Sequence, residues 1–160
     1  MLNSNFSIIE INDSEKKYHY TKEILEKLPD WFGNEQSNEE YAEGSRECPY
    51  WAAFDNEQNC IGFLALKVHY SYTGDIYVCG VLPEYHNKGI GKAIYKEVEQ
   101  YLIQKDCKYV IVKTLSETAN YEPYDKTRKF YESIGFGSLI TLTEMWDEEN
   151  PCLIMIKKLA

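Results

Sequence analysis

One change in hydrophobic period constrains the fold more than any other feature of the sequence. Residues 75–81 form an apolar run rich in β-branched and aromatic side chains, which is typical of a strand. From Gly89 onward the apolar positions recur at the spacing of an α-helix. Only a short loop separates the two patterns. The chain must therefore contain a strand that passes through a tight turn directly into an amphipathic helix.

Further strand and helix patterns run along the rest of the chain. Apolar runs predict strands over residues 6–11, 50–54, 61–70, 109–115, 136–145 and 152–158. Helices are predicted from Ser14, as the N-cap, to about Leu28, within residues 31–47, and over residues 124–134, where Gly135 ends the helix. Turn residues predict that the strands at 50–54, 61–70 and 75–81 are consecutive and antiparallel. The order β-α-α-β-β-β-α-β-α-β-β predicts a mixed α/β or α+β domain.

The size and charge of the chain limit what it can be. Its 160 residues, of which 44% are hydrophobic, predict a single domain over residues 1–160. The 17 Lys and Arg residues against 26 Asp and Glu give a net charge of −9, which argues against a broad nucleic-acid or anionic-membrane surface. The longest apolar runs are far shorter than the roughly 20 residues that span a bilayer. Because the first residues lack the features of a secretory signal, we expect a cytoplasmic protein.

The cysteines have the pattern of reduced thiols. There are five of them, widely spaced, with no C-x-x-C pair and no histidine at zinc-binding spacing: Cys48, Cys60, Cys79, Cys107 and Cys152. Free cysteine is among the most buried residue types. We therefore expect small buried side chains and no metal site.

The loop between the strand and the helix has the chemistry of a phosphate-binding site. The first amides of a helix have no partner inside it and carry the positive end of the helix dipole. Gly89 and Gly91 let an anion approach without interference from a Cβ atom, and Lys88 and Lys92 add positive charge. Neither G-x-x-x-x-G-K-[ST] nor G-x-G-x-x-G is present, so nucleoside triphosphates and dinucleotides lose support. A turn that binds no ligand is the alternative.

Two motifs resemble those of a known family. Residues 86–91 read His-Asn-Lys-Gly-Ile-Gly, and residues 129–136 read Lys-Phe-Tyr-Glu-Ser-Ile-Gly-Phe. They are similar to [Q/R]-x-x-G-x-[G/A] and F-Y-x-x-x-G-F of the GNAT superfamily of acetyl-CoA-dependent N-acetyltransferases. The resemblance implies a GNAT-like fold, with a central, mostly antiparallel mixed sheet of about seven strands flanked by helices. Two positions depart from the family pattern, since His86 replaces Gln or Arg and Tyr124 replaces an Asn.

The resemblance also implies which residues hold acetyl-CoA, the co-substrate. The diphosphate would bind to the loop formed by His86, Asn87, Lys88, Gly89, Ile90, Gly91 and Lys92. The amide of Cys79 would face the thioester oxygen, and Val81 would hold the pantetheine arm. Gly80 between them would ease a bulge that frees these donors from the sheet. Arg128 would meet a phosphate of the cofactor or extend into solvent.

Direct transfer of an acetyl group to an amine requires an acid for the leaving thiolate and removal of a proton from the amine. Tyr131 stands at the position of the family's acid, and a phenol with a pKa of about 10 is protonated at neutral pH. Asp75, four residues before Cys79, stands where histone-acetylating relatives carry a glutamate base. Four residues of strand span about 13 Å, so Asp75 would act through water. His69, Glu117 and the carboxylates of residues 35–47 are open alternatives for the base.

The amine acceptor stays open at this point. Trp31, Phe32 and Trp146 would line its pocket, and acidic residues within 35–47 and 147–149 would attract a cationic amine, although such runs are commonly only solvated. The predicted activity moves acetyl from acetyl-CoA directly to a primary amine of a small molecule, peptide or protein. We expect no metal, nucleic-acid or membrane partner, and the resemblance is compatible with a homodimer. A non-catalytic acyl-CoA-binding or sensory domain is the main alternative, and a non-enzymatic interaction domain is the second.

Overall fold

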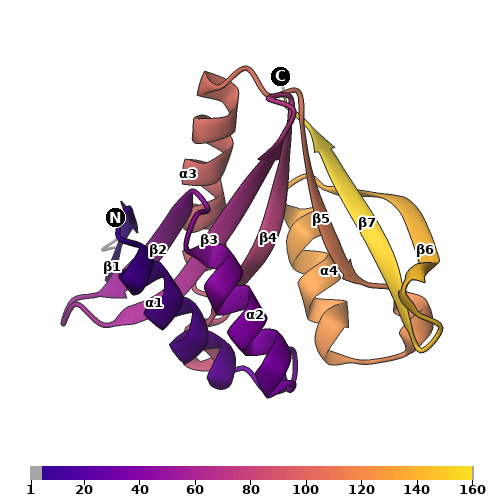
Figure 1. Ribbon diagram of the computed structural model, residues 1–160, viewed down its shortest axis with the longest axis horizontal. Coiled ribbons are helices and arrows are strands. Elements are labelled where there is room, and N and C mark those ends of the chain that lie inside the picture. Colours follow the sequence, from indigo (N-terminus) through magenta and orange to yellow (C-terminus); the bar gives the residue numbers. More distant parts are fainter. Residues whose placement is uncertain (1–4, 160) are drawn as a thin grey trace. The chain divides into compact units, whose positions relative to one another are not determined.

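Strands and helices follow one another in the predicted order (Figure 1). The computed structural model describes residues 5–159. The strands are β1 (Phe6–Glu10), β2 (Tyr50–Asp55), β3 (Cys60–His69), β4 (Thr73–Val81), β5 (Tyr109–Leu115), β6 (Gly137–Asp147) and β7 (Asn150–Lys158). The helices are α1 (Ser14–Glu26), α2 (Glu35–Ser45), α3 (Ile90–Gln104) and α4 (Pro123–Ser133), with short 3-10 turns at Pro83–Tyr85 and Glu117–Ala119. The mixed α/β order predicted from periodicity is confirmed.

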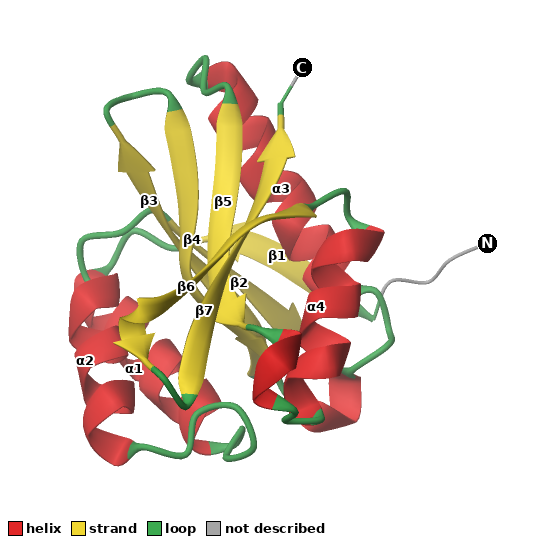
Figure 2. Cartoon of the chain, turned by 90° about the vertical axis from the view of Figure 1, so that its right-hand side faces the viewer, coloured by secondary structure: helices red, strands yellow, loops and turns green. Residues whose placement is uncertain are grey.

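Hydrogen bonds join the strands into a mixed sheet. In the described chain the sheet has seven strands in the order β1-β2-β3-β4-β5-β7-β6. The pairs β1–β2, β2–β3, β5–β7 and β6–β7 are antiparallel, whereas β4 pairs with β5 in parallel over Thr73–Ile76. The strands β6 and β7 lie side by side and are joined by a tight turn (Figure 2). The GNAT-like sheet expected from the resemblance is therefore confirmed.

The chain divides into two compact units. One comprises the chain as far as Lys67 together with Tyr77–Tyr101, and the other comprises Val68–Ile76 and the chain from Leu102 onward. The strands β3 and β4 pass from one unit into the other. Each unit has its own buried apolar side chains, described next.

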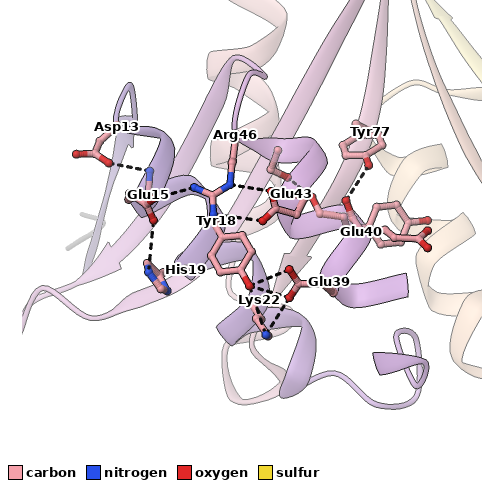
Figure 3. A network of polar contacts seen from close by, with 12 residues as sticks. Asp13, Glu15, Tyr18, His19, Lys22, Glu39, Glu40, Glu43, Arg46 and Tyr77 are labelled. Carbon is pink, nitrogen blue, oxygen red and sulfur yellow. Dashed lines mark hydrogen bonds and ion pairs between the residues drawn. The ribbon is translucent and has the colours of Figure 1, made fainter. Parts of the chain in front are cut away.

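In the first unit the apolar face of α1 and the strands β2 and β3 supply the core. Ile24 and Leu25 are fully buried, and the rings of Tyr50 and Phe63 stack with centroids 5.5 Å apart. Polar contacts join α1 to α2 at the surface, where Glu39 accepts hydrogen bonds from Tyr18 at 2.7 Å and from Lys22 at 2.9 Å (Figure 3). Burial of apolar area and these contacts together hold the helix pair in place.

Both ends of α1 differ from the prediction. The N-cap is Asp13 and not Ser14, because the Asp13 carboxylate accepts hydrogen bonds from the amides of Glu15 and Lys16. At the other end the helix stops at Glu26, since the amide of Leu28 bonds to Leu25 in a tighter turn. Pro29 follows and has no amide with which to continue the helix.

In the second unit β5 and β7 supply the core. Val110 and Val112 of β5 and Leu153 and Met155 of β7 are buried. The neighbouring strand β6 is exposed along nearly its whole length, and Trp146 near its end is 44% exposed. The buried core of this unit therefore includes β7, while the side chains of β6 lie largely outside it.

All five cysteines are free thiols, as predicted. Cys48, Cys107 and Cys152 are buried, while Cys60 and Cys79 are part-exposed. Burial raises the pKa of the Cys60 thiol to about 12. Within residues 5–159 no cluster of His, Cys, Asp or Glu side chains is arranged to hold a metal ion. Over the same residues no helix has the length and apolar character needed to span a membrane.

Candidate functional site

The loop after β4 turns twice through left-handed backbone conformations. The amide of His86 closes the short 3-10 turn by bonding to Pro83 at 3.1 Å. Asn87 then has a φ of 63° and Gly89 a φ of 82°. Asparagine tolerates this region of backbone space better than most residues, and glycine enters it without a Cβ penalty. This sequence of residues therefore allows the sharp entry into α3 that the motif predicted.

Within residues 5–159 the amides of this loop have no acceptor. The first helical bond of α3 runs from the Ala93 amide to the Gly89 carbonyl at 3.0 Å. Among the hydrogen bonds of the described residues, none pairs an amide of residues 87–92. A run of unpaired donors at the start of a helix is suited to an anion.

The surroundings of these amides favour negative charge. Lys88 and Lys92 are exposed, and the first turn of α3 contains no acidic residue. A Cβ atom built on Gly89 would meet no atom within 4 Å, so the space above the loop is open. Lys88 also lines a cavity of about 170 Å³ with Asn5, Phe6, Tyr85 and Ile90. The residues present fit a diphosphate.

His86 holds the loop to the end of β4. Its Nε2 atom donates to the Val81 carbonyl at 2.7 Å, and its ring meets Trp31 edge to face with centroids 5.6 Å apart. The structure thus brings together three residues singled out in the sequence. The histidine that replaces the family's Gln or Arg links the strand end to the loop.

Gly80 has a packing reason that the sequence did not reveal. A Cβ atom built on Gly80 would lie 2.8 Å from Cδ1 of Leu28 and 3.3 Å from Cγ2 of Ile24. Its φ lies outside the left-handed region. The close approach of α1 leaves no room for a Cβ atom, which accounts for a glycine at this position. Cys79, which precedes Gly80, is half-buried.

Tyr131 lies buried in the last turn of α4. It is 4% exposed, and its ring contacts those of Phe130 and Phe136 with centroids 5.5 and 5.7 Å apart. The amide of Phe136 bonds to the Tyr131 carbonyl at 3.0 Å and the amide of Gly135 to Glu132 at 3.1 Å. With Gly135 at a φ of 103°, these bonds form a Schellman helix end. The second motif therefore also ends α4 and packs Phe136 against Tyr131.

Arg128 is buried and not solvated. Its Nη1 atom donates to the Leu115 carbonyl at 2.5 Å, and its Nη2 atom pairs with Asp125. The guanidinium thus ties α4 to the end of β5. It lines a cavity of about 260 Å³ with Glu117, Asp125, Lys129, Glu132, Ser138 and Met155. These contacts favour a positioning role for Arg128.

Asp75 belongs to a cluster with His69 and Lys113. The Oδ2 atom of Asp75 lies 2.8 Å from Nε2 of His69 and 3.2 Å from Nζ of Lys113. The Asp75 side chain is 7% exposed, against 46% for His69 and 34% for Lys113. Sequence reasoning singled out Asp75 and His69 separately and missed Lys113. The available signal was strand alternation, because Asp75 pairs with Ile111, and Lys113 lies two residues further on the same face.

Acidic residues that were predicted to attract a cationic amine form hydrogen bonds and ion pairs with other residues of this chain. Hydrogen bonds from Tyr18 and Lys22 lower the pKa of Glu39, and Glu43 pairs with Arg46 (Figure 3). Asp147 accepts the amides of Glu149 and Asn150 and so closes the turn between β6 and β7. Phe32 and Trp146, which were predicted to line the acceptor pocket, lie far apart in the sequence. Phe32 packs against Tyr41, and neither Phe32 nor Trp146 lines the two cavities described above.

Thr114, whose hydroxyl group is buried in the structure, was not singled out by sequence reasoning. Thr114 on β5 is 3% exposed, and within residues 5–159 its Oγ1 atom has no hydrogen-bond partner. Buried polar atoms without partners are uncommon and cost stability. No sequence motif marks this position.

Similarity to known proteins agrees with the fold and with the loop. The model of the Acetyltransferase (GNAT) family matches residues 8–136, which include the loop and end at Phe136 of the second motif. No curated protein sequence matches the chain significantly.

Solved structures of low sequence identity share the fold. A protein assigned to the GNAT family from Desulfovibrio desulfuricans matches with a TM-score of 0.80 and 16% identity, over 97% of this chain and 99% of that one. An aminoglycoside 6′-N-acetyltransferase in complex with coenzyme A matches with a TM-score of 0.75 and 18% identity, over 96% and 97%. The ribosomal-protein-S18-alanine N-acetyltransferase of Escherichia coli matches with a TM-score of 0.73 and 13% identity, over 97% and 94%. With its family model matched over most of its length, the chain belongs to the GNAT family of acetyltransferases, enzymes that transfer acyl groups from acetyl-CoA.

Proposed function

We propose that this enzyme transfers acetyl from acetyl-CoA directly to a primary amine of a small molecule, peptide or protein. The observation that carries the proposal is the run of amides at residues 87–92 that have no acceptor within residues 5–159. Lys88 and Lys92 lie beside them, and the first turn of α3 contains no acid. Helix-start amides of this kind bind phosphate groups. Bound acetyl-CoA would supply the acetyl group in activated form.

The backbone of the loop would hold the diphosphate, with Lys88 and Lys92 contributing charge. Gly89 keeps the approach open because it carries no side chain. The family resemblance assigns the thioester oxygen to the Cys79 amide and the pantetheine arm to Val81. Trp31 and His86 would support the loop through their mutual contact.

Proton movements are assigned to two groups. Tyr131 is proposed as the acid that protonates the leaving sulfur, because it stands at the family's acid position and a phenol is protonated at neutral pH. Removal of a proton from the amine is assigned to the cluster of Asp75, His69 and Lys113. A lysine-like amine requires such removal, because only about one part in a thousand is neutral at pH 7.

The acceptor class is the open part of the proposal. Two similar structures are named for an aminoglycoside and for the alanine of a ribosomal protein, so one fold serves unlike amines. Trp31, Phe32 and Trp146 are the proposed acceptor contacts. A panel of polyamines, aminoglycosides, amino acids and peptides, read by release of free thiol, would identify the class.

Thermal melting with coenzyme A and turnover on the amine panel test the proposal together. Coenzyme A at 100 times its Kd is expected to stabilise the protein by about 2.7 kcal/mol. Tyr131→Phe should then keep coenzyme A affinity and lose about 100-fold in kcat. Tyr50→Phe, which removes a buried hydroxyl bonded to Thr21 at 2.9 Å, is the matched control and should keep turnover.

The alternatives give different results. A non-catalytic acyl-CoA-binding domain would be stabilised by coenzyme A without turning over any amine. An interaction domain would show neither effect. Unchanged turnover in Tyr131→Phe would remove the acid assignment alone.

A further inference from the structure

The cluster around Asp75 has its polar atoms arranged in a fixed order. One carboxylate oxygen, Oδ2, receives both His69 Nε2 at 2.8 Å and Lys113 Nζ at 3.2 Å. An ionised carboxylate acts only as an acceptor, so both contacts are donations to Asp75. The atom nearest to both donors is therefore already engaged. Asp75 is also the most buried member, with its side chain 7% exposed.

The other ring nitrogen of His69, Nδ1, is the atom available to accept a proton. When Nε2 of His69 carries the hydrogen that it donates to Asp75, the Nδ1 atom has none and can accept a proton. The His69 side chain is 46% exposed, so this atom lies where solvent and a polar acceptor molecule reach. A histidine oriented by a carboxylate is a common form of general base.

The hairpin between β3 and β4 is anchored at its tip. His69 ends β3 and Asp75 lies in β4, with Tyr70 and Ser71 in left-handed conformations between them. The Tyr72 carbonyl accepts the amides of Lys108 at 2.7 Å and Tyr109 at 3.3 Å. The turn is thus tied to the start of β5, and the Tyr72 amide bonds to the His69 carbonyl at 3.2 Å, so backbone bonds fix the turn between His69 and Asp75.

We propose that His69 is the group that takes the amine's proton, passed through ordered water to Nδ1, and that Asp75 is a positioning residue that holds the imidazole. The inference rests on the proposed acetyl transfer. An ammonium acceptor loses two protons as its nitrogen forms the bond to the acetyl carbon and the carbon–sulfur bond breaks. One proton ends on the released thiol, and the other passes through His69 to solvent. The Nε2 hydrogen stays bonded to Asp75 throughout.

Chemical rescue tests the role of His69. His69→Ala should lower kcat about 100-fold on the amine with the highest wild-type turnover, and added imidazole should restore part of the loss in a saturable way. Coenzyme A affinity should not change. His19→Ala is the matched control, because His19 is a 69% exposed histidine of α1, and it should neither lose activity nor respond to imidazole.

Nuclear magnetic resonance provides a readout that does not depend on turnover. The chain has only three histidines, so single variants assign each signal of a ¹⁵N-histidine sample. At a pH where the ring is neutral, His69 should carry its hydrogen on Nε2 in the wild type and populate both tautomers in Asp75→Ala. Thermal melting confirms that each variant is folded.

Three results would overturn the inference. These are full turnover in folded His69→Ala, a loss of turnover that imidazole does not restore, and an Nδ1–H tautomer of His69 in the wild type. If the wild type binds coenzyme A and acetylates an amine while one of these results is obtained, only the role of His69 fails. If the wild type does neither, the proposed function fails.

Discussion

The helices α1 and α3 begin in opposite ways. At α1 the Asp13 side chain accepts the amides of Glu15 and Lys16 at 2.9 and 3.1 Å, and Glu15 adds an acid to the first turn. At α3 the first helical carbonyl belongs to Gly89, which has no side chain, and the first turn contains no acid. In any helix the first amides have no partner inside the helix and lie at the positive end of its dipole. One start is satisfied internally, and the other is left for a partner.

The other two helices share with α1 an acid in the first turn. Glu35 lies in the first turn of α2 and Asp125 in the first turn of α4. Acids outnumber Lys and Arg by 26 to 17 in this chain, so an acid-free helix start is not a by-product of composition. Among the four helices described, the departure at α3 coincides with the loop that we propose binds the diphosphate.

Among the tests of this comparison, the largest effect is expected from making α3 resemble α1. In Lys92→Glu a carboxylate would repel the diphosphate and favour the helix dipole. We expect coenzyme A affinity to fall about 30-fold, or about 2 kcal/mol, by isothermal titration calorimetry, with thermal stability kept or raised. Lys96→Glu makes the same charge change at an exposed position one turn later and is the control. An equal loss in both variants would mean that net charge, and not the helix start, sets the affinity.

Gly89→Ala tests the backbone of the same start. At a φ of 82° an alanine is strained, so the free energy of unfolding should fall by about 1 kcal/mol in denaturant titrations. Gly137→Ala is the control, because a Cβ atom there also meets nothing within 4 Å and its φ is not left-handed. A similar cost at both glycines would contradict the argument from backbone conformation.

Asp13→Ala removes the internal partner at α1. The free energy of unfolding should fall by about 1 kcal/mol, while coenzyme A affinity should stay unchanged. Ser14→Ala separates the observed cap from the one predicted by sequence, since Asp13 alone accepts the two amides. If Ser14→Ala were the more damaging change, the assignment of the cap would be wrong.

The smallest effect concerns an unpaired group that is buried, unlike the loop of α3. Thr114→Val removes a hydroxyl that has no partner within residues 5–159, so the free energy of unfolding should rise by about 0.5 kcal/mol. Thr21→Val is the matched control, because its buried hydroxyl bonds to Tyr50 at 2.9 Å and its loss should destabilise the protein. Destabilisation by both changes would show that Thr114 has a partner in solution.

Sequence reasoning was strongest where the signal is local. The strand at residues 109–115 has the predicted bounds, and the turn residues Asn87, Gly89 and Gly135 adopt the positive φ values that their types favour. It was weakest where a side chain has several partners within reach. Asp13 and Ser14 are both good cap residues, and only the chain's path into α1 selects Asp13.

The order of the elements, the open helix start of α3 and the end of α4 at Gly135 follow from the amino-acid sequence itself, because periodicity and backbone sterics act over a few residues. The partners of Asp75, Arg128 and His86 were decided only by the tertiary structure. Lys113 reaches Asp75 through the register of β4 on β5, and Arg128 reaches Leu115 through the path of the chain into α4. Register and helix placement depend on how distant segments bury their apolar faces together, and no local pattern encodes that.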